Sequence, residues 1–497
     1  MQNRVSTNRD SALVLTIDVG TSSLRVLAYD RSAHRVAHVE GRRAVTVTSD
    51  ATGAAEVDSV QLLRDMVACI DDVIMQLGPC ANDIVAVGMA TMATTMVGLD
   101  ATGQPVGPLR TYADTRSDDA SHTLRAEYAE TTVHARTGCL IRPNYWPARL
   151  RWLQTAMPAE WQRATHWVPI GGYVAYYFTG ARRVTPSEAA WTGLCHRESL
   201  QWDAVWLKQL DVHAAMFAQI VDVDVPLPAL GAAWAARWPA LAGVPWYGAM
   251  GDGAAANVGS GCVDERFLAL TVGTTGAMRI ALPGTPMPPA GLWCYRIDRQ
   301  TALVGGATSE GGNVFQWMSD TLRIDGDDAT IQHRLGQYRA DAHGLTILPL
   351  FAGERSPGWA GDAKATIHGL HLGITPFDLL RASLESIALR FGQIAARLPV
   401  TGQVIASGGA LEQSPVWMQI CADVLGRPVY ASGVDEATAR GVAVVALRSL
   451  GIIPSLAALP TAPTVCYTPD DVAHQAYRRA GERQRLLYER LITQPFG

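Results

Sequence analysis

One short pattern occurs twice in this chain, once in each half. Residues 13–29 contain an apolar run, a Val-Gly-Thr-Ser turn and a second apolar run, and residues 267–282 repeat this order around Val-Gly-Thr-Thr. An apolar strand, a tight polar turn and another apolar strand predict a β-hairpin. Two matching hairpins predict a duplicated core in which the turns face each other and hold a phosphate chain from both sides. The alternative is two unrelated hairpins that share turn residues.

The rest of the chain mixes strand and helix patterns. Residues 57–77 have the apolar spacing of an amphipathic helix, and residues 84–89 read as a strand. Helix patterns return at 313–323 and at 376–398. This mixture predicts the α/β class. Near residues 245–250 a strand pattern gives way to the Gly/Ala-rich segment 251–261, and this change predicts a domain boundary there.

Charge and lysine usage exclude several function classes. The chain has 41 basic and 46 acidic residues, a net charge of −5, so a general nucleic-acid binder is not expected. The only lysines are Lys208 and Lys364, and neither stands in a P-loop or in a protein-kinase motif. Phosphate chemistry must therefore depend on backbone amides, hydroxyls, arginine or a metal ion.

Cysteine and histidine patterns give no metal site. The eight cysteines form no CxxC pair, which fits a reducing compartment. There is no HExxH pattern, and His343 and His368 are expected at the surface or at helix ends. No stretch reads as a signal peptide or a membrane span, so we expect a cytoplasmic protein.

The first turn contains residue types that bind phosphate. Gly20 lets the backbone approach an anion closely, and Arg25 supplies a fixed positive charge. Hydroxyl donors follow the glycine, at Thr21, Ser22 and Ser23. Asp18 has two interpretations: it holds Mg²⁺, or it stabilises the turn as an Asx residue.

Asp252 stands between Gly251 and Gly253, after a strand pattern and before a helix pattern. It is either a helix N-cap or a base that accepts a proton from an attacking hydroxyl. The same glycines fit a dinucleotide fingerprint, but no acidic residue follows at the required distance, so an oxidoreductase is disfavoured.

Together these motifs resemble the FGGY carbohydrate kinases, which have an actin-like (ribonuclease H-like) ATPase fold. The resemblance runs from about residue 13 to about residue 450. It is carried by DVGTSSLR at 18–25, LTVGTTG at 270–276, ATIHGLHLGITPFDLLRASLE at 365–385 and SGGALEQSPVWMQICADVLGRPV at 407–429. It implies two actin-like domains around a central cleft, at 11–247 and 248–455, and a C-terminal helical extension at 456–497.

The resemblance also implies a role for each site residue. Asp252 would be the catalytic base, and Asp18 with Asp252 would hold Mg²⁺. The residues implied for ATP are Gly20, Thr21, Ser22, Arg25, Gly273, Thr274, Thr275, Gly312, Gln316, Gly409 and Gln413. Those implied for the sugar are Ala93, Thr94, Tyr112, Asn144 and Asp252.

The substrate is less determined than the reaction. Gluconate and xylulose kinases carry Met-His where this chain has Ala93-Thr94, which leaves a wider pocket without an imidazole. We expect a gluconate-like sugar acid first, with Arg142 or Arg149 near its carboxylate, and D-xylulose second. The partner is a small carbohydrate, with no nucleic acid or membrane, and a homodimer stays open. The alternative function is an actin-fold ATPase or sugar-binding protein without kinase activity.

Overall fold

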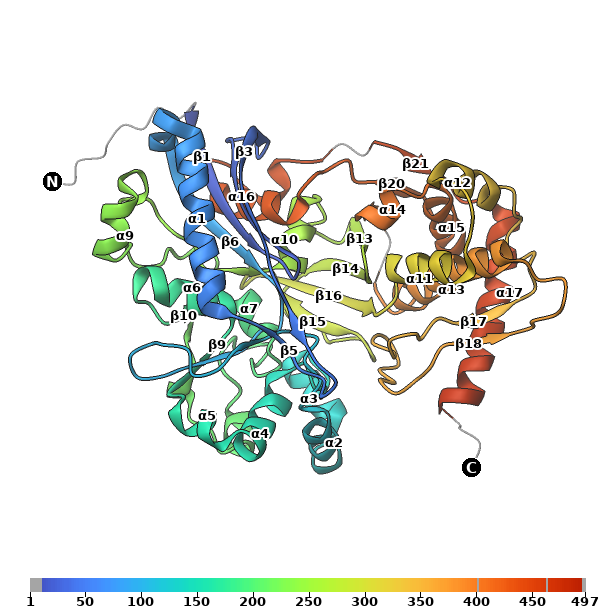
Figure 1. The fold of residues 1–497 in the computed structure, drawn as a ribbon, viewed down its shortest axis with the longest axis horizontal. Coiled ribbons are helices and arrows are strands. Elements are labelled where there is room, and N and C mark those ends of the chain that lie inside the picture. The colour runs from blue at the N-terminus through green and yellow to red at the C-terminus, as the bar shows by residue number, and fades with distance from the viewer. Residues whose placement is uncertain (1–10, 400–401, 462–463, 494–497) are drawn as a thin grey trace.

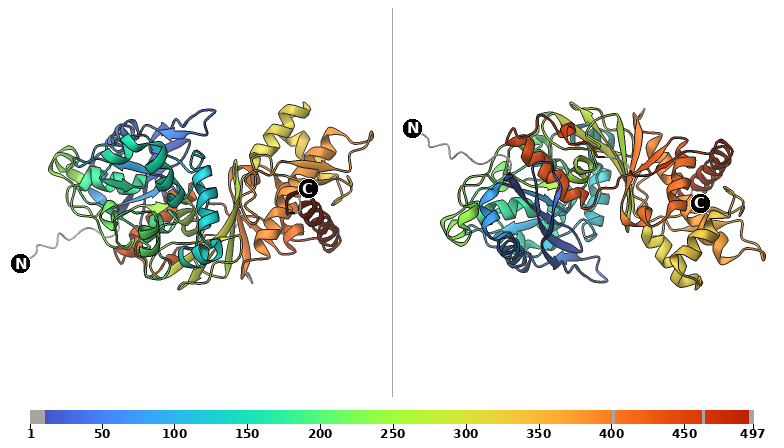
Figure 2. Two further views of the ribbon diagram at one scale, coloured as in Figure 1. Left: turned by 90° about the horizontal axis from the view of Figure 1, so that it is seen from below. Right: turned by 90° about the horizontal axis from the view of Figure 1, so that it is seen from above.

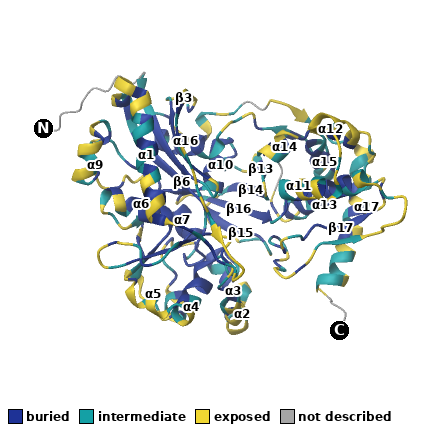
Figure 3. Ribbon diagram, in the orientation of Figure 1, coloured by how far each residue is buried: buried dark blue, intermediate teal, exposed yellow. Residues whose placement is uncertain are grey.

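The computed structural model describes residues 11–399, 402–461 and 464–493. The chain forms two lobes, each built on a mixed β-sheet with helices packed against it (Figures 1 and 2). Figure 3 shows that the strands of both sheets are buried, while the outer faces of the surrounding helices are exposed. This arrangement confirms the α/β class and the two-domain, actin-like fold predicted from the sequence.

The first sheet has the strand order β12-β6-β1-β2-β3. Its strands are β1 (Leu13–Val19), β2 (Ser23–Tyr29), β3 (Arg35–Ala44), β6 (Ile84–Thr91) and β12 (Met250–Gly251). Strands β1, β2 and β3 form an antiparallel meander, and β6 and β12 continue the sheet in parallel with β1.

The second sheet repeats this topology in the order β15-β16-β14-β13-β19-β20-β21. Its strands are β13 (Phe267–Val272), β14 (Gly276–Pro283), β15 (Trp293–Arg296), β16 (Thr301–Thr308), β19 (Gln403–Ser407), β20 (Val429–Ala431) and β21 (Cys466–Tyr467). Strands β14 and β16 correspond to β2 and β3, and the parallel strands β19 and β20 correspond to β6 and β12. Strands β15 and β21 are additional antiparallel strands at the two edges. The two hairpins are therefore equivalent parts of a duplicated fold.

Strand β1 is buried on both faces, so its side chains alternate between two cores. Leu15, Ile17 and Val19 face α1 (Ser59–Leu77). Val14 faces the opposite core, to which α10 (Asp252–Gly259) and α16 (Ala437–Ser449) contribute. Because side chains alternate along a strand, Asp18 points to the same face as Val14, toward α10 and α16.

Helices α10 and α16 cross in very close contact. A Cβ atom at Gly259 would lie 1.7 Å from the carbonyl oxygen of Ala437, and one at Gly441 would lie 1.8 Å from that of Ala255. Both helices belong to the range 248–455 expected for the second domain, yet they cover the first sheet (Figure 1). A sheet with parallel strands needs helices on both faces, and these two supply one of them.

A large insertion separates β6 from β12 and packs around the buried rings of Trp146, Trp167 and Trp206. Its elements are β7 (Val97–Leu99), β8 (Leu109–Arg110), α2 (Asp118–Glu127), α3 (Glu130–Thr137), α4 (Trp146–Ala156), α5 (Pro158–Arg163), β9 (His166–Val168), α6 (Ile170–Thr179), β10 (Arg183–Val184), α7 (Pro186–Ala190), α8 (Ala204–Gln209), β11 (Gln219–Ile220) and α9 (Ala232–Arg237). Strand β8 joins β4 (Thr48–Ser49) and β5 (Ala55–Val57) in a small sheet.

The second lobe is completed by α11 (Gly312–Leu322), α12 (Asp328–Gly336), β17 (Thr346–Leu348), β18 (Thr366–His368), α13 (Pro376–Ala395), α14 (Gly409–Glu412), α15 (Pro415–Leu425) and α17 (Asp471–Tyr488). Helix α17 packs firmly onto this lobe, since the hydroxyl of its buried Tyr477 donates to Glu385 at 2.8 Å. In the described part of the chain, no helix has the length and apolar character needed to cross a bilayer.

The expectation for His343 is wrong. Its side chain is buried, and its Nε2 lies 3.0 Å from a carboxylate oxygen of Glu385. Arg381 and Tyr477 contact the other oxygen of Glu385. The segment 365–385, which carried part of the resemblance, therefore contributes Glu385 to a buried polar network inside the second lobe.

Candidate active site

The two predicted carboxylates meet at one edge of the first sheet. Asp18 pairs with Ala90 across β1 and β6, and Thr91 pairs with Gly251 across β6 and β12. The three strands are parallel, so their carboxyl ends lie together, where α/β proteins bind ligands. Asp252 directly follows Gly251 and opens α10 on the same side of the sheet as Asp18.

Asp18 is almost completely buried and forms an ion pair with Arg25, with 2.7 Å between Oδ2 and Nη2. Burial raises the pKa of Asp18 to about 6, although Arg25 opposes this, and the nearby carboxylates of Asp252 and Glu436 raise it further. A carboxyl group crowded by two others favours a proton or a bound cation.

Arg25 bridges two carboxylates. Besides Asp18, its guanidinium contacts Glu436, the residue that precedes α16 and has a φ of 53°. The charge of Arg25, one of the residues implied for ATP, is thus paired with two protein carboxylates in this structure. Glu436 lies 411 residues from Arg25 along the chain, so sequence patterns give no signal for this contact.

Asp252 occupies the first turn of α10, and the N-cap position belongs to Gly251. Its carboxylate accepts a hydrogen bond of 2.8 Å from the amide of Gly253. Burial raises its pKa, while the Gly253 amide and the positive charges of Arg279 and Arg355 oppose that rise. Asp252 is therefore held with a raised pKa in the field of two arginines, which makes its carboxylate a better proton acceptor than an ordinary aspartate.

The turn of the second hairpin adjoins the start of α11. The amide of Gly273 donates to Thr275 at 3.0 Å, and the amide of Gly312 donates to Gly273 at 2.8 Å. Gly408 has a φ of 98°, and a Cβ there would lie 2.5 Å from the carbonyl oxygen of Val272. These backbone contacts bring three of the predicted ATP segments together around one turn.

Open space lies beside this turn. A Cβ added at Gly273 or at Gly409 would meet no described atom within 4 Å. Gln316 and Gln413 are exposed, and the amide of Gln316 bonds to Asp320 at 2.9 Å. Gln316 and Gln413, both implied for ATP, therefore border accessible space on the second lobe.

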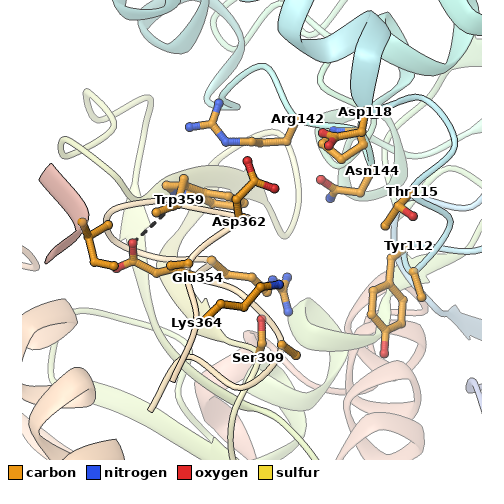
Figure 4. Close-up of a pocket in the computed structure, with 18 of the residues that line it drawn as sticks. Tyr112, Thr115, Asp118, Arg142, Asn144, Ser309, Glu354, Trp359, Asp362 and Lys364 are labelled. Carbon is orange, nitrogen blue, oxygen red and sulfur yellow. Dashed lines mark hydrogen bonds between the residues drawn. The ribbon is translucent and has the colours of Figure 1, made fainter. Parts of the chain in front are cut away.

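A cavity of about 1140 Å³ lies between the two lobes (Figure 4). Tyr112 and Asn144 line it from the insertion, as the resemblance implies, and Thr275 lines it from the second hairpin. Arg355 lines the same cavity and its charge acts on Asp252, although Asp252 itself is not among the residues that line the cavity.

Ala93 and Thr94 line a separate, small cavity together with Glu188, Trp191 and Gly251. Within the described residues, the buried Thr94 hydroxyl and both carboxyl oxygens of Glu188 have no hydrogen-bond partner. Burial raises the pKa of Glu188 to about 8, although the nearby amides of Thr185 and Gly171 oppose this. The wider space expected at Ala93-Thr94 is not found, because these residues line only a small cavity beside polar groups that the sequence did not single out.

The two arginines expected near a substrate carboxylate differ in position. Arg149 is buried, and its guanidinium donates to the backbone carbonyls of Thr94 and Thr111, so it does not face the large cavity. Burial lowers its pKa to about 9. Arg142 lines the cavity but is paired with Glu130. The expectation that Arg149 lies near a substrate carboxylate is therefore wrong. Its guanidinium instead joins two backbone segments, at Thr94 and Thr111.

Comparison of the sequence with known protein families identifies the family of this chain. The N-terminal domain of the FGGY family of carbohydrate kinases matches residues 13–259, and the C-terminal domain of that family matches residues 268–450. The chain therefore belongs to the FGGY family of carbohydrate kinases. It is an ATP-dependent carbohydrate kinase, a phosphotransferase with an alcohol group as acceptor.

The similar proteins differ in their named substrates. A glycerol kinase from Polaromonas sp. (strain JS666 / ATCC BAA-500) is 30% identical over 465 residues, covering 88% of this chain and 91% of the relative. A xylulose kinase from Lactobacillus acidophilus superposes with a TM-score of 0.92 at 22% identity, covering 97% of this chain and 99% of that one. A gluconate kinase from the same organism gives 0.89 at 21%, covering 96% and 98%. The two superpositions show the fold alone.

Proposed function

We propose that this protein transfers the γ-phosphoryl group of ATP to a hydroxyl of a gluconate-like sugar acid, with Asp252 as the base. D-xylulose is the second candidate. The observation that carries this proposal is the position of Asp252, which lies beside Asp18 at the sheet edge and near a cavity that both lobes line.

Asp252 would accept the proton of the attacking hydroxyl. Its raised pKa supports this role, because a carboxylate that is more basic than usual takes a proton more readily. The glycines on either side of Asp252 leave room for the ring of Trp191. A side chain at Gly253 would collide with the ring of Trp191, whose atom Cη2 would lie 2.9 Å from the added Cβ.

The two hairpin turns would hold the nucleotide from opposite lobes. Gly20, Thr21 and Ser22 offer backbone amides and hydroxyls on the first lobe. Residues 273–275 offer the same groups on the second, and Gly312, Gln316, Gly409 and Gln413 would border the adenosine. The open space at Gly273 and Gly409 supports this assignment.

Asp18 and Asp252 fit the metal ion that the reaction would use. The charge of Asp252 raises the pKa of Asp18, so the two carboxylates lie close enough to interact, and they would supply the hard oxygen ligands that Mg²⁺ prefers. Bound Mg²⁺ would neutralise developing charge on the phosphates. The residues present are therefore suited to the ion.

The sugar would lie against Tyr112 and Asn144 in the large cavity, with Ala93 and Thr94 nearby. The motifs YADTRS at 112–117 and GERSPGW at 353–359 resemble those of gluconate-type kinases, and this resemblance favours a gluconate-like acid. Membership of a kinase family disfavours the alternative of an ATPase or sugar-binding protein without kinase activity.

A coupled ADP-release assay tests this function. We expect little ADP from ATP and Mg²⁺ alone, and rapid release when gluconate is added. D-xylulose, D-ribulose and glycerol serve as comparison acceptors. Release that no acceptor accelerates would contradict the kinase assignment, whereas a strong preference for D-xylulose with gluconate inert would overturn only the ranking.

A further inference from the structure

Arg355 is an unpaired cation in the wall of the large cavity. It follows β17 in the loop that leads to β18, and its side chain is partly buried. Among the described residues its guanidinium has no hydrogen bond and no ion pair, whereas most charged neighbours in the same wall do. Arg142 is paired with Glu130, and Glu354 with Arg390.

The loop holds Arg355 in place on both sides. The amide of Ser356 donates to Ala307 at 2.9 Å, and the amide of Glu354 donates to Ala360 at 2.9 Å. The buried Glu354 carboxylate accepts from the amide of Gly358 at 3.2 Å and from the hydroxyl of Tyr488 at 2.5 Å. The Arg355 backbone is thus fixed before any ligand arrives, which lowers the entropic cost of binding through its side chain.

The charge of Arg355 acts at the sugar end of the cavity. Arg355, Tyr112 and Asn144 line the same cavity, and the charge of Arg355 opposes the raised pKa of Tyr145, the residue that follows Asn144. Arg355 therefore faces the space beside the wall predicted to bind the sugar. A ligand that fills this space removes water from the guanidinium, which is costly unless the ligand brings an anion.

We infer that Arg355 binds the carboxylate of a sugar-acid substrate and determines the preference for an acid over a neutral sugar. This inference rests on the proposed function and names the substrate class of that site. A guanidinium presents two parallel N–H donors that match a carboxylate, and this geometry distinguishes an acid from a hydroxymethyl group. Lys364, also in the cavity wall, lacks that fork.

The test compares Arg355→Ala and Arg355→Lys with the wild type. The measurements are kcat/KM for gluconate, kcat/KM for D-xylulose and the KM for ATP. We expect Arg355→Ala to lower kcat/KM for gluconate by at least about 10-fold, the usual effect of losing a charged hydrogen bond. The kcat/KM for D-xylulose should fall by less than that for gluconate, because any effect of the lost charge on Asp252 is common to both substrates. The KM for ATP should change by less than about 3-fold. Arg355→Lys should retain part of the gluconate activity.

Arg163→Ala is the matched control, since Arg163 is exposed in α5 and far from the cavity wall. Circular dichroism and thermal melting check that each variant is folded. Equal losses for gluconate and D-xylulose would contradict the inference, because they indicate contact with the transferred phosphoryl group. Unchanged gluconate kinetics would contradict it as well.

Calorimetry with gluconate in the absence of nucleotide separates this inference from the kinase function. Gluconate binding that is lost in Arg355→Ala supports the inference even if turnover is absent, and the proposed function alone would then fail. A wild type that does not bind gluconate, or a variant that binds it equally well, would overturn the inference.

Discussion

The two hairpin turns have the same topology but carry different polar side chains. In the first, Asp18 pairs directly with Arg25 across the strands, and Glu436 binds the same guanidinium. In the second, Thr271 pairs with Ala277, and Arg279 reaches the Thr271 hydroxyl diagonally, at 3.3 Å. The first turn has an acid where the second has a hydroxyl.

This difference suits the turns of the two lobes to different ligands. The acidic turn lies beside Asp252 and suits a cation and the reacting groups. The neutral turn has open space beside Gly273 and amides from α11 nearby, which suits a nucleotide. The two turns therefore have equivalent backbones, and a few different side chains suit them to different ligands.

The largest expected effect comes from the base on the acidic side. Asp252→Asn keeps the size of the side chain but cannot accept a proton at neutral pH. We predict a fall in kcat of at least about 10²-fold, the scale of general-base catalysis, with nucleotide affinity largely retained. Steady-state kinetics and calorimetry measure the two quantities. Near-normal turnover would contradict the role of Asp252.

Arg25→Ala tests the ion-pair bridge of the first turn. Its charge would act on the phosphoryl group during transfer, so we predict a larger loss in kcat than in nucleotide affinity. Glu436→Gln is the companion variant, because it weakens the competing contact without removing Arg25. If Arg25→Ala weakened nucleotide binding as strongly as turnover, the two turns would not differ as described.

Asp18 should give the enzyme a pH dependence. We predict that kcat/KM rises as pH increases through about 6, because the ionised carboxylate is the form that would hold Mg²⁺. Stability changes in the opposite direction. The folded pKa is higher than the unfolded value, so the favourable contribution present below the unfolded pKa is lost as pH rises through about 6.

Asp18→Asn separates these two effects. The variant should lose activity at all pH values, and its free energy of unfolding should lack the decrease between about pH 4 and pH 6. Chemical denaturation at several pH values measures this. A wild type and an Asp18→Asn variant with parallel stability profiles would contradict the raised pKa.

The smallest expected effect comes from the neutral turn. Thr274→Val removes one exposed hydroxyl donor and should weaken ATP and ADP binding by about 3- to 10-fold, the usual value of one hydrogen bond. Thr274→Ser keeps the hydroxyl and serves as the control. Unchanged nucleotide affinity in the valine variant, measured by calorimetry, would mean that the second turn does not hold the phosphates.

Local patterns predicted much of this molecule, because a hairpin depends on residues that are neighbours in the chain. The repeat, the helices and the two aspartates followed from such patterns. Glu436, Arg279 and Arg355 did not, since each acts on a partner that is close only after folding. The crossing of α10 and α16 could not be predicted either. It depends on two glycines 182 residues apart, at 259 and 441, each of which packs against the backbone of the other helix.

The central claim is that Asp252 directs phosphoryl transfer from ATP, held by the two turns, to a sugar acid bound in the cavity between the lobes. The most direct test is a single-turnover experiment with γ-labelled ATP, Mg²⁺ and gluconate. The wild type should move the label onto gluconate, and Asp252→Asn should move at least about 10²-fold less in the same time. Label that appears only as inorganic phosphate, or equal transfer by both proteins, would contradict the claim.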